Sequence, residues 1–154
     1  MQDDEYRSRF HRLIDNPENP YHPLAWIRGE PEIGAGTYIG GFSEINAKGA
    51  RVVIGSNCDI ASFVAINVAD SHRRAIGLAT EIQRRDIFIG NYVFIGTHSA
   101  VLGGANIGVH SVVAAGTVVR SETIPPFSLV FGNPATVKAG YYADAFQKLK
   151  IGQE

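Results

Sequence analysis

The chain has 154 residues, with 14 lysines and arginines against 15 aspartates and glutamates, and this near balance excludes a basic field for a nucleic-acid backbone. Its apolar runs fall far short of the ~20 residues that span a membrane, so we expect neither a nucleic-acid nor a membrane partner. The single cysteine, Cys58, cannot form an internal disulfide and fits a reducing compartment. We therefore expect a cytoplasmic protein with a single domain over residues 1–154.

The N-terminal segment predicts a short amphipathic helix. Its apolar side chains recur at helical spacing, at Tyr6, Phe10, Leu13 and Ile14. Acidic residues at the helix start favour its dipole, and the prolines that follow must end it. We interpret residues 1–32 as an N-terminal helix and cap that covers one open end of the structure that follows.

A six-residue repeat runs through the middle of the chain. An aliphatic residue recurs at every sixth position and is usually followed by a small one, and the phase slips by three residues once, across Lys48 to Val53. The aliphatic positions are Ile33, Ile39 and Ile45, then Ile54, Ile60 and Ile66, then Ile89, Ile95, Val101, Ile107, Val113 and Val119.

This period fits neither an amphipathic helix nor an alternating hairpin strand. It suits short flat strands separated by corners, with three strands making a coil of ~18 residues. We therefore predict an all-β fold, a parallel β-helix of about five coils over residues 33–138, with its aliphatic side chains stacked inside. Cys58 falls on a compact inward position of its repeat, so we interpret it as core packing.

The repeat is interrupted once, between Ile66 and Ile89. These residues lie 23 positions apart where six are due, so about 17 residues must leave the solenoid as a polar, charged loop over residues 68–86. A long insertion in a strict scaffold is usually functional or disordered. His72 follows Asp70 by two residues, so in an extended segment both side chains point to the same side and Asp70 can orient the imidazole.

A second amphipathic helix is predicted near the C-terminal end. Tyr142, Phe146 and Leu149 form its apolar stripe, and two lysines lie in its last turn. We expect residues 139–154 to form this helix and to cover the other open edge of the solenoid.

Three segments of the second half resemble one protein family. They read Ile-Gly-Asn-Tyr-Val-Phe-Ile-Gly-Thr-His-Ser-Ala-Val-Leu-Gly-Gly from Ile89, Ile-Gly-Val-His-Ser-Val-Val-Ala-Ala-Gly-Thr-Val-Val from Ile107, and Ile-Pro-Pro-Phe-Ser-Leu-Val-Phe-Gly-Asn-Pro-Ala from Ile124. They are similar to the hexapeptide-repeat acyltransferases, above all to the sugar O- and N-acetyltransferases of the maltose/galactoside and surface-polysaccharide group. The resemblance covers about residues 33–140 and implies left-handed coils, which the period alone does not predict.

The resemblance implies an acetyl-CoA-dependent transfer to a hydroxyl or amine of a sugar or nucleotide-linked sugar, in surface polysaccharide or lipopolysaccharide biosynthesis. The family uses a loop histidine as general base for direct attack on the thioester, and His72 matches that position. Imidazole titrates near neutral pH, which suits this role. The family's upstream asparagine, which contacts the acceptor, has no residue in register here, and Glu44 and Asn46 are close to its position.

The resemblance also implies where the donor binds. The pantetheine arm of acetyl-CoA is expected along a groove beside the last coils, against the backbone of Thr97 and Ala115, one coil apart. Arg120 and Lys138 lie near the end of the repeats and are candidates to meet the phosphates. No metal is implied.

Two readings from other classes stay open. A γ-class carbonic-anhydrase-like zinc protein would share the prism, but it needs three converging histidines, and His72, His98 and His110 are widely spaced along the chain. A non-catalytic β-helix scaffold would need neither the histidine-bearing loop nor the proline-rich tail.

We expect a homotrimer. Several positions expected to face outward are more apolar than a free surface requires, namely Val68, Phe88, Phe94 and Val112. The family resemblance adds that three prisms pack around a threefold axis, with the active site between neighbours.

Overall fold

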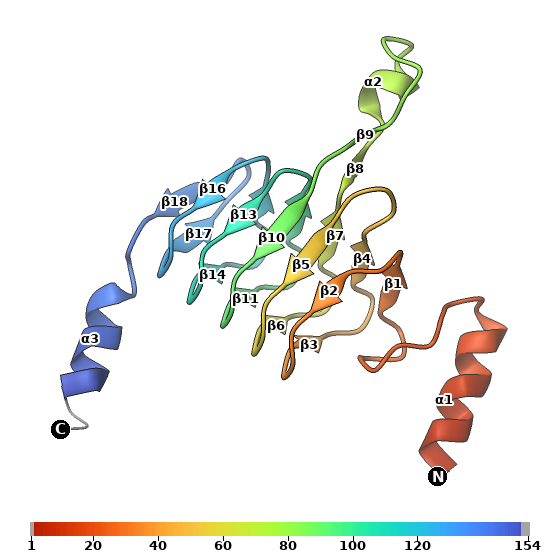
Figure 1. Ribbon diagram of the computed structural model, residues 1–154, viewed down its shortest axis with the longest axis horizontal. Helices are drawn as coiled ribbons and strands as arrows, with labels where there is room; N and C mark the ends of the chain where they lie inside the picture. The colour runs from red at the N-terminus through yellow and green to blue at the C-terminus, as the bar shows by residue number, and fades with distance from the viewer. Residues whose placement is uncertain (1, 152–154) are drawn as a thin grey trace.

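Three flat parallel sheets form the faces of a prism, as the computed structural model of residues 2–151 shows (Figure 1). The chain visits sheets A, B and C in turn, and five such circuits make five coils. The predicted parallel β-helix of about five coils is therefore present.

The strands are short, and each sheet contains one strand from every coil. Sheet A consists of β1 (Trp26–Arg28), β4 (Glu44–Asn46), β7 (Ala65–Asn67), β12 (Ala100–Leu102) and β15 (Val118–Val119). Sheet B consists of β2 (Glu32–Ile33), β5 (Val52–Ile54), β10 (Ile87–Ile89), β13 (Asn106–Ile107) and β16 (Thr123–Ile124). Sheet C consists of β3 (Tyr38–Ile39), β6 (Asp59–Ile60), β11 (Phe94–Ile95), β14 (Val112–Val113), β17 (Leu129–Phe131) and β18 (Thr136–Lys138). The last of these, β18, pairs antiparallel to β17.

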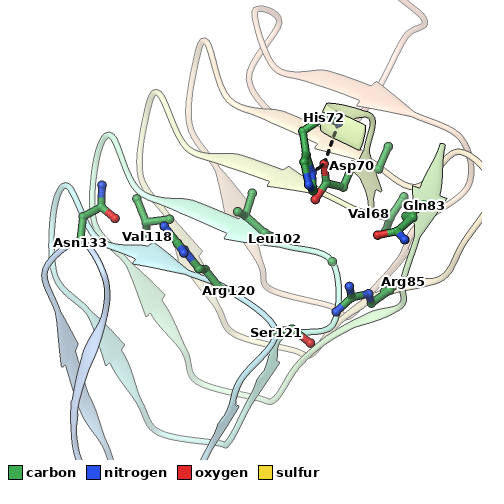
Figure 2. Close-up of a pocket in the computed structure, with 12 residues that line it drawn as sticks. Val68, Asp70, His72, Gln83, Arg85, Leu102, Val118, Arg120, Ser121 and Asn133 are labelled. Carbon is green, nitrogen blue, oxygen red and sulfur yellow. Dashed lines mark hydrogen bonds and ion pairs between the residues drawn. The ribbon is translucent and has the colours of Figure 1, made fainter. Parts of the chain in front are cut away.

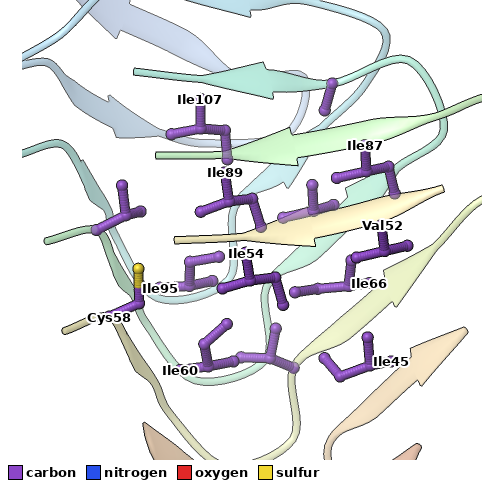
Figure 3. Packing of buried hydrophobic residues seen from close by; sticks show 14 of the residues in the cluster. Ile45, Val52, Ile54, Cys58, Ile60, Ile66, Ile87, Ile89, Ile95 and Ile107 are labelled. Carbon is purple, nitrogen blue, oxygen red and sulfur yellow. The ribbon is translucent and has the colours of Figure 1, made fainter. Parts of the chain in front are cut away.

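Each sheet contributes one column of aliphatic side chains to the interior. In-register pairing places every residue of a column on its equivalent one coil away, and sheet B stacks Ile33, Ile54, Ile89, Ile107 and Ile124 in this way. Figure 3 shows the middle of this column, at Ile54, Ile89 and Ile107. All the predicted aliphatic positions are buried except Ile33, which is half-buried in the first coil. The repeat thus predicted the core correctly.

Cys58 is part of this core. Its side chain is buried, and its thiol donates to the carbonyl oxygen of Gly90 across 3.1 Å. Burial raises the pKa of the thiol, which disfavours the reactive thiolate. The interpretation of Cys58 as packing is confirmed.

The corners turn through residues in the left-handed region, and several of these carry rings. Phe42, Phe63 and His98 occupy equivalent corners between sheets C and A, with φ of 62°, 62° and 59°, and their rings stack with centroids 5.0 Å apart. A side chain in this region costs roughly 1–2 kcal/mol, which ring stacking partly offsets. A second column stacks His110 between Tyr92 and Phe127. His98 and His110, the two histidines of the repeat other than His72, therefore both lie on prism corners, as expected.

The N-terminal helix α1 (Gln2–Leu13) stands out from the first coil (Figure 1). The expectation that its apolar stripe covers the prism is wrong, because Tyr6 and Leu13 are 68% and 79% exposed. Polar contacts attach the helix instead. Arg7 donates to the carbonyl of Asn19 across 2.7 Å, and the ring of buried His11 lies 3.2 Å from the carbonyl of Asn16.

The C-terminal helix α3 (Ala143–Ile151) leaves the opposite end of the prism (Figure 1). The ring of Phe146 packs against His110 and Phe127, at centroid distances of 4.5 and 5.2 Å, while Leu149 is exposed. The prediction placed this helix at 139–154, and residues 152–154 lie outside the described residues. No helix in the described part of the chain is both long and apolar enough to cross a membrane.

The outward positions of the prism differ in part from expectation. Phe88 and Phe94 are exposed and Val112 is half-buried. Val68 is only 1% exposed, so its outward placement is wrong. The cause is the base of the insertion, where the backbone N–H of Arg85 donates to the carbonyl of Val68 across 3.1 Å and holds the chain over it.

Truncation of one core residue should destabilise the fold strongly. Ile95 is completely buried between Ile60 and Val113, so Ile95→Ala should lower the free energy of unfolding by about 2–5 kcal/mol, measured by urea denaturation. Leu13→Ala, at an exposed site, is the control and should stay within about 0.5 kcal/mol of wild type. Equal effects of the two changes would contradict the stacked-column account.

Candidate functional site

The insertion leaves the prism at the corner between sheets A and B of the third coil. After β7 the chain forms β8 (Ala69–Asp70), the one-turn helix α2 (His72–Ala75) and β9 (Gln83–Arg84), and then re-enters the prism at β10. Strands β8 and β9 pair antiparallel, so the insertion projects as a narrow ribbon with α2 near its tip (Figure 1). The predicted loop therefore exists, and its base has regular structure.

Neighbouring corners are shaped to hold the base of this ribbon. The three-residue slip widens the corner of the second coil, where Arg84 Nε donates to the carbonyl of Lys48 across 3.0 Å. In the fourth coil a Cβ on Gly103 would lie 2.7 Å from the carbonyl oxygen of Val68, so only glycine lets that coil approach so closely. The sequence shows the slip and the glycine, but it does not show that both accommodate the base of the ribbon.

His72 and Asp70 form a hydrogen-bonded pair on the ribbon. Asp70 Oδ1 accepts from the backbone N–H of His72 across 3.1 Å and lies 2.6 Å from His72 Nδ1 (Figure 2). A carboxylate can only accept, so Nδ1 carries the proton and Nε2 of the neutral ring is left with a lone pair. These bonds, first the backbone one, hold the pKa of the Asp70 carboxyl below its usual value. The contact between Asp70 and His72 is present, but it forms where His72 begins α2 and not along an extended segment as expected.

The pair opens onto a cleft of about 570 Å³ on the outer face of sheet A (Figure 2). The side chains of His72 and Asp70 are 64% and 55% exposed, so substrates can reach them. The cleft is lined by Val68, Ala69, Asp70, His72, Gln83, Arg85, Leu102, Gly103, Val118, Arg120, Ser121 and Asn133. It combines a general-base candidate, two guanidinium groups, an apolar floor and amide and hydroxyl groups that can bond to a polyol.

Of the predicted site residues, the cleft collects three. His72, Asp70 and Arg120 line it, although they come from the insertion and from the corner of the fifth coil. The sequence interpretation missed Arg85, which follows β9 and lines the same cleft. A signal was available, because Arg85 lies at the end of the insertion, two residues before β10 begins at Ile87.

The predicted donor-binding residues lie elsewhere on the prism. Thr97 and Ala115 occupy the corner between sheets C and A, whereas the insertion leaves from the corner between sheets A and B. At the C–A corner the backbone N–H of Gly116 donates to the carbonyl of Thr97 across 2.9 Å. Neither residue lines the cleft. Lys138 lies on β18, and its amino group sits over the rings of Phe131 and Tyr141 at 5.5 and 5.8 Å.

The predicted acceptor-binding residues lie on β4, toward the N-terminal side of the cleft. Glu44 forms an ion pair with Arg28 across 2.9 Å. Asn46 donates to the side-chain oxygen of Asn67 across 3.2 Å, directly below the start of the ribbon. Neither residue lines the cleft. Within residues 2–151, no three side chains of the metal-binding types histidine, cysteine, aspartate and glutamate converge.

Known proteins are similar to this chain in sequence. A Saccharomyces cerevisiae protein named provisionally as an acetyltransferase is 38% identical over 115 residues, 69% of this chain and 57% of that protein. A provisionally named acetyltransferase of Staphylococcus aureus is 51% identical over 51 residues, 33% of this chain and 25% of that protein. The chain thus spans little more than half of the first relative and a quarter of the second. No protein-family model matches the chain.

Solved structures share the fold. NeuO, a polySia-specific acetyltransferase, has a TM-score of 0.60 at 25% identity, over 75% of this chain and 61% of its own. A hexapeptide-repeat acetyltransferase from Vibrio cholerae has a TM-score of 0.55 at 25% identity, over 91% and 93%, and has also been crystallised with acetyl-CoA. The N-acyltransferase AntD from Bacillus cereus, crystallised with dTDP and coenzyme A, has a TM-score of 0.69 over 84% and 74%, and its 18% identity shows the fold alone.

These comparisons bear out the predicted all-β, left-handed parallel β-helix of about five coils. They also agree with the quoted hexad and tail motifs, which pointed to the same group of proteins. The chain is therefore similar in sequence and in fold to the hexapeptide-repeat acetyltransferases, and the resemblance predicted from its motifs is confirmed.

Proposed function

We propose that this protein is an acetyl-CoA-dependent acetyltransferase that acts on a hydroxyl or an amine of a sugar or a nucleotide-linked sugar. The observation that carries the proposal is the His72–Asp70 pair, held at a cleft of about 570 Å³. The names of similar proteins support it, since they include a polySia-specific acetyltransferase, a maltose O-acetyltransferase and an N-acyltransferase crystallised with dTDP. A role in surface polysaccharide or lipopolysaccharide biosynthesis, in the cytoplasm, is part of the same proposal.

His72 acts as the general base in this reaction. Nε2 takes the proton of the acceptor's hydroxyl or amine while that oxygen or nitrogen attacks the thioester carbonyl carbon. The imidazolium then transfers this proton to the leaving thiolate of coenzyme A. Asp70 keeps the proton on Nδ1 and stabilises the imidazolium that forms. The lowered pKa of Asp70 keeps its carboxylate charged throughout the neutral range, so this support does not depend on pH near neutrality.

The donor is proposed to lie along the corner that carries Thr97 and Ala115. The backbone at this corner is open to close approach, because Gly116 has a φ of 72° and a Cβ there would meet no atom within 4 Å. Lys138 ends β18, the last strand of the prism, and it is proposed to bind the phosphates of coenzyme A. Glu44 and Asn46 are proposed to contact the acceptor on the side away from the donor.

The activity itself is tested by thiol release from acetyl-CoA with a panel of amino- and hydroxy-sugars, free and nucleotide-linked. We expect release that depends on one class of sugar, and a rise in melting temperature with acetyl-CoA, because a ligand of the native state stabilises it. No thiol release with any sugar, together with turnover of a non-sugar amine, would remove the sugar assignment.

Replacement of the base should damage chemistry far more than binding of the donor. General bases contribute about 10²–10⁴-fold, or about 3–5 kcal/mol of barrier, so His72→Ala should lower kcat by that factor while the Kd of acetyl-CoA changes little. Steady-state kinetics and calorimetry measure the two quantities. The fold should survive, because the His72 side chain is exposed and outside the core.

Two matched controls are available in the prism. His98→Asn and His110→Asn keep a residue that tolerates positive φ, and both variants should stay within a few-fold of wild-type kcat. Wild-type kcat/KM should fall on acidification, because protonation removes the lone pair of the base. Near-normal turnover of His72→Ala, or a large loss in the His98 variant, would contradict the assignment.

We also propose that the protein is a homotrimer whose sites lie between neighbouring prisms. The ribbon carries exposed apolar side chains beyond α2, at Ile76 and Leu78, and the prism exposes Phe88 and Phe94. Such side chains favour burial against another protein surface. A ribbon that reaches an adjacent subunit would bring His72 against that subunit's face.

Light scattering at micromolar concentration should give three times the mass of one chain. Replacing both apolar residues at the ribbon tip with acids, Ile76→Glu with Leu78→Glu, should weaken assembly and lower kcat together, because a charge is costly in an apolar contact. The double change Ile76→Ser with Leu78→Ser should have a smaller effect. A stable, fully active monomer would refute the proposal.

A further inference from the structure

We propose that the cleft beside His72 recognises an anionic group of the acceptor, a phosphate or a carboxylate, through Arg85 and Arg120. The inference rests on the proposed acetyltransferase function and narrows its substrate class. Both arginines line the cleft that His72 and Asp70 line, and Figure 2 shows them along one side of it, across from that pair.

The first observation is that, in the described part of the chain, neither guanidinium group is within ion-pair or hydrogen-bond distance of another side chain. Within residues 2–151, Arg28 pairs with Glu44, Arg51 pairs with Glu32, and Arg84 donates to a backbone carbonyl. In the same part of the chain, the side chains of Arg85 and Arg120 form neither an ion pair nor a hydrogen bond.

Nearby carboxylates are engaged in other contacts. Asp86 Oδ1 accepts from the backbone N–H of Arg51 across 2.8 Å, and Glu122 Oε1 accepts from the backbone N–H of Arg120 across 3.3 Å. Asp70, the one acid among the described residues that line the cleft, holds His72. Among the residues that line the cleft, two guanidinium groups stand against the one carboxylate of Asp70, so this lining is net positive with neutral His72.

The backbone at both arginines is held in place. The N–H of Arg85 donates to the carbonyl of buried Val68, and Arg120 and Glu122 are joined by a backbone hydrogen bond of 2.8 Å at the corner after β15. Gly103 lines the cleft in the coil between them, and its lack of a side chain lets that coil pack closely against the backbone of Val68 and Arg85. A held backbone limits how far each guanidinium group can move, which favours a defined anion site over a diffuse surface charge.

The chemistry of arginine selects the kind of ligand. A guanidinium group is a planar fork that binds phosphate or carboxylate oxygens in pairs. Ser121, Gln83 and Asn133 line the same cleft and suit neutral hydroxyls, while Leu102 and Val118 form an apolar floor. An acceptor held by its charged end at the arginines can therefore present a hydroxyl or amine to His72. The phosphates of a nucleotide-linked sugar and the carboxylate of an acidic sugar share this chemistry.

The same charges could instead serve the phosphates of coenzyme A, which is the role that the motifs implied for Arg120. The structure separates Arg120 from the corner of Thr97 and Ala115 proposed for the donor, but the thioester must still reach His72, whose cleft Arg120 lines. The test must therefore separate acceptor from donor.

The first arm uses inorganic pyrophosphate as the anion probe, measured by calorimetry on the full chain at low salt. Wild type should bind it, also in the presence of saturating acetyl-CoA, and the double variant Arg85→Gln with Arg120→Gln should bind at least about tenfold more weakly. The double lysine variant keeps the charge but loses the fork, and it should fall between them. Arg12→Gln, on the exposed surface of α1, is the control and should bind like wild type.

The second arm measures the Kd of acetyl-CoA for the same variants, which should stay within about twofold of wild type. Equal pyrophosphate binding by wild type and the double glutamine variant would overturn the inference. Loss of pyrophosphate binding when acetyl-CoA is present, or a parallel loss of acetyl-CoA affinity in the variants, would also overturn it and assign the arginines to the donor. Failure of the proposed function would instead appear as absent thiol release by wild type, which leaves the pyrophosphate result readable.

Discussion

In-register stacking of the three aliphatic columns is the constraint on which the rest of this structure depends. Each inward residue must lie over its equivalent one coil away, as Ile89 does between Ile54 and Ile107. A strand with one residue more or less would turn its side chains to the opposite faces and break the column. Extra residues are therefore tolerated only at the corners, and the corner between sheets A and B has received all of the large ones.

The functional cleft follows from this restriction. The three-residue slip at Lys48, the ribbon after Asn67 and the glycine at position 103 are successive corners of one prism edge, so they stack as the coils do. The rigid part of the site is the outer face of sheet A, and the ribbon adds His72 and Asp70 above it. Side chains from the third, fourth and fifth coils thus meet in space because the columns beneath them keep a strict period.

The sequence predicted most of the fold because the period is local information. The buried columns, the position of the insertion and the packing role of Cys58 could all be read from spacing, whereas the Asp70–His72 contact forms at the turn from β8 into α2 and not on an extended segment. Val68 and the stripe at Tyr6 and Leu13 were misjudged for the opposite reason. Burial of Val68 depends on Arg85 crossing over it, and exposure of Tyr6 depends on how α1 leaves the prism. Neither fact is encoded in the pattern of its own segment.

The sequence could not place Arg85 and Arg120 in one cleft for the same reason. They are 35 residues apart, and only the stacking of the coils brings them to the same site.

The stacked columns have a further consequence for how proteins of this architecture change in length. Each coil contacts only the coils before and after it, so stability is close to a sum of neighbouring interfaces. A whole coil can then be gained or lost at the cost of one interface, whereas a gain of one or two residues inside a strand would disturb every coil above it. Length should vary in steps of about 18 residues, while new chemistry enters through the corners, where additions of any size leave the columns intact.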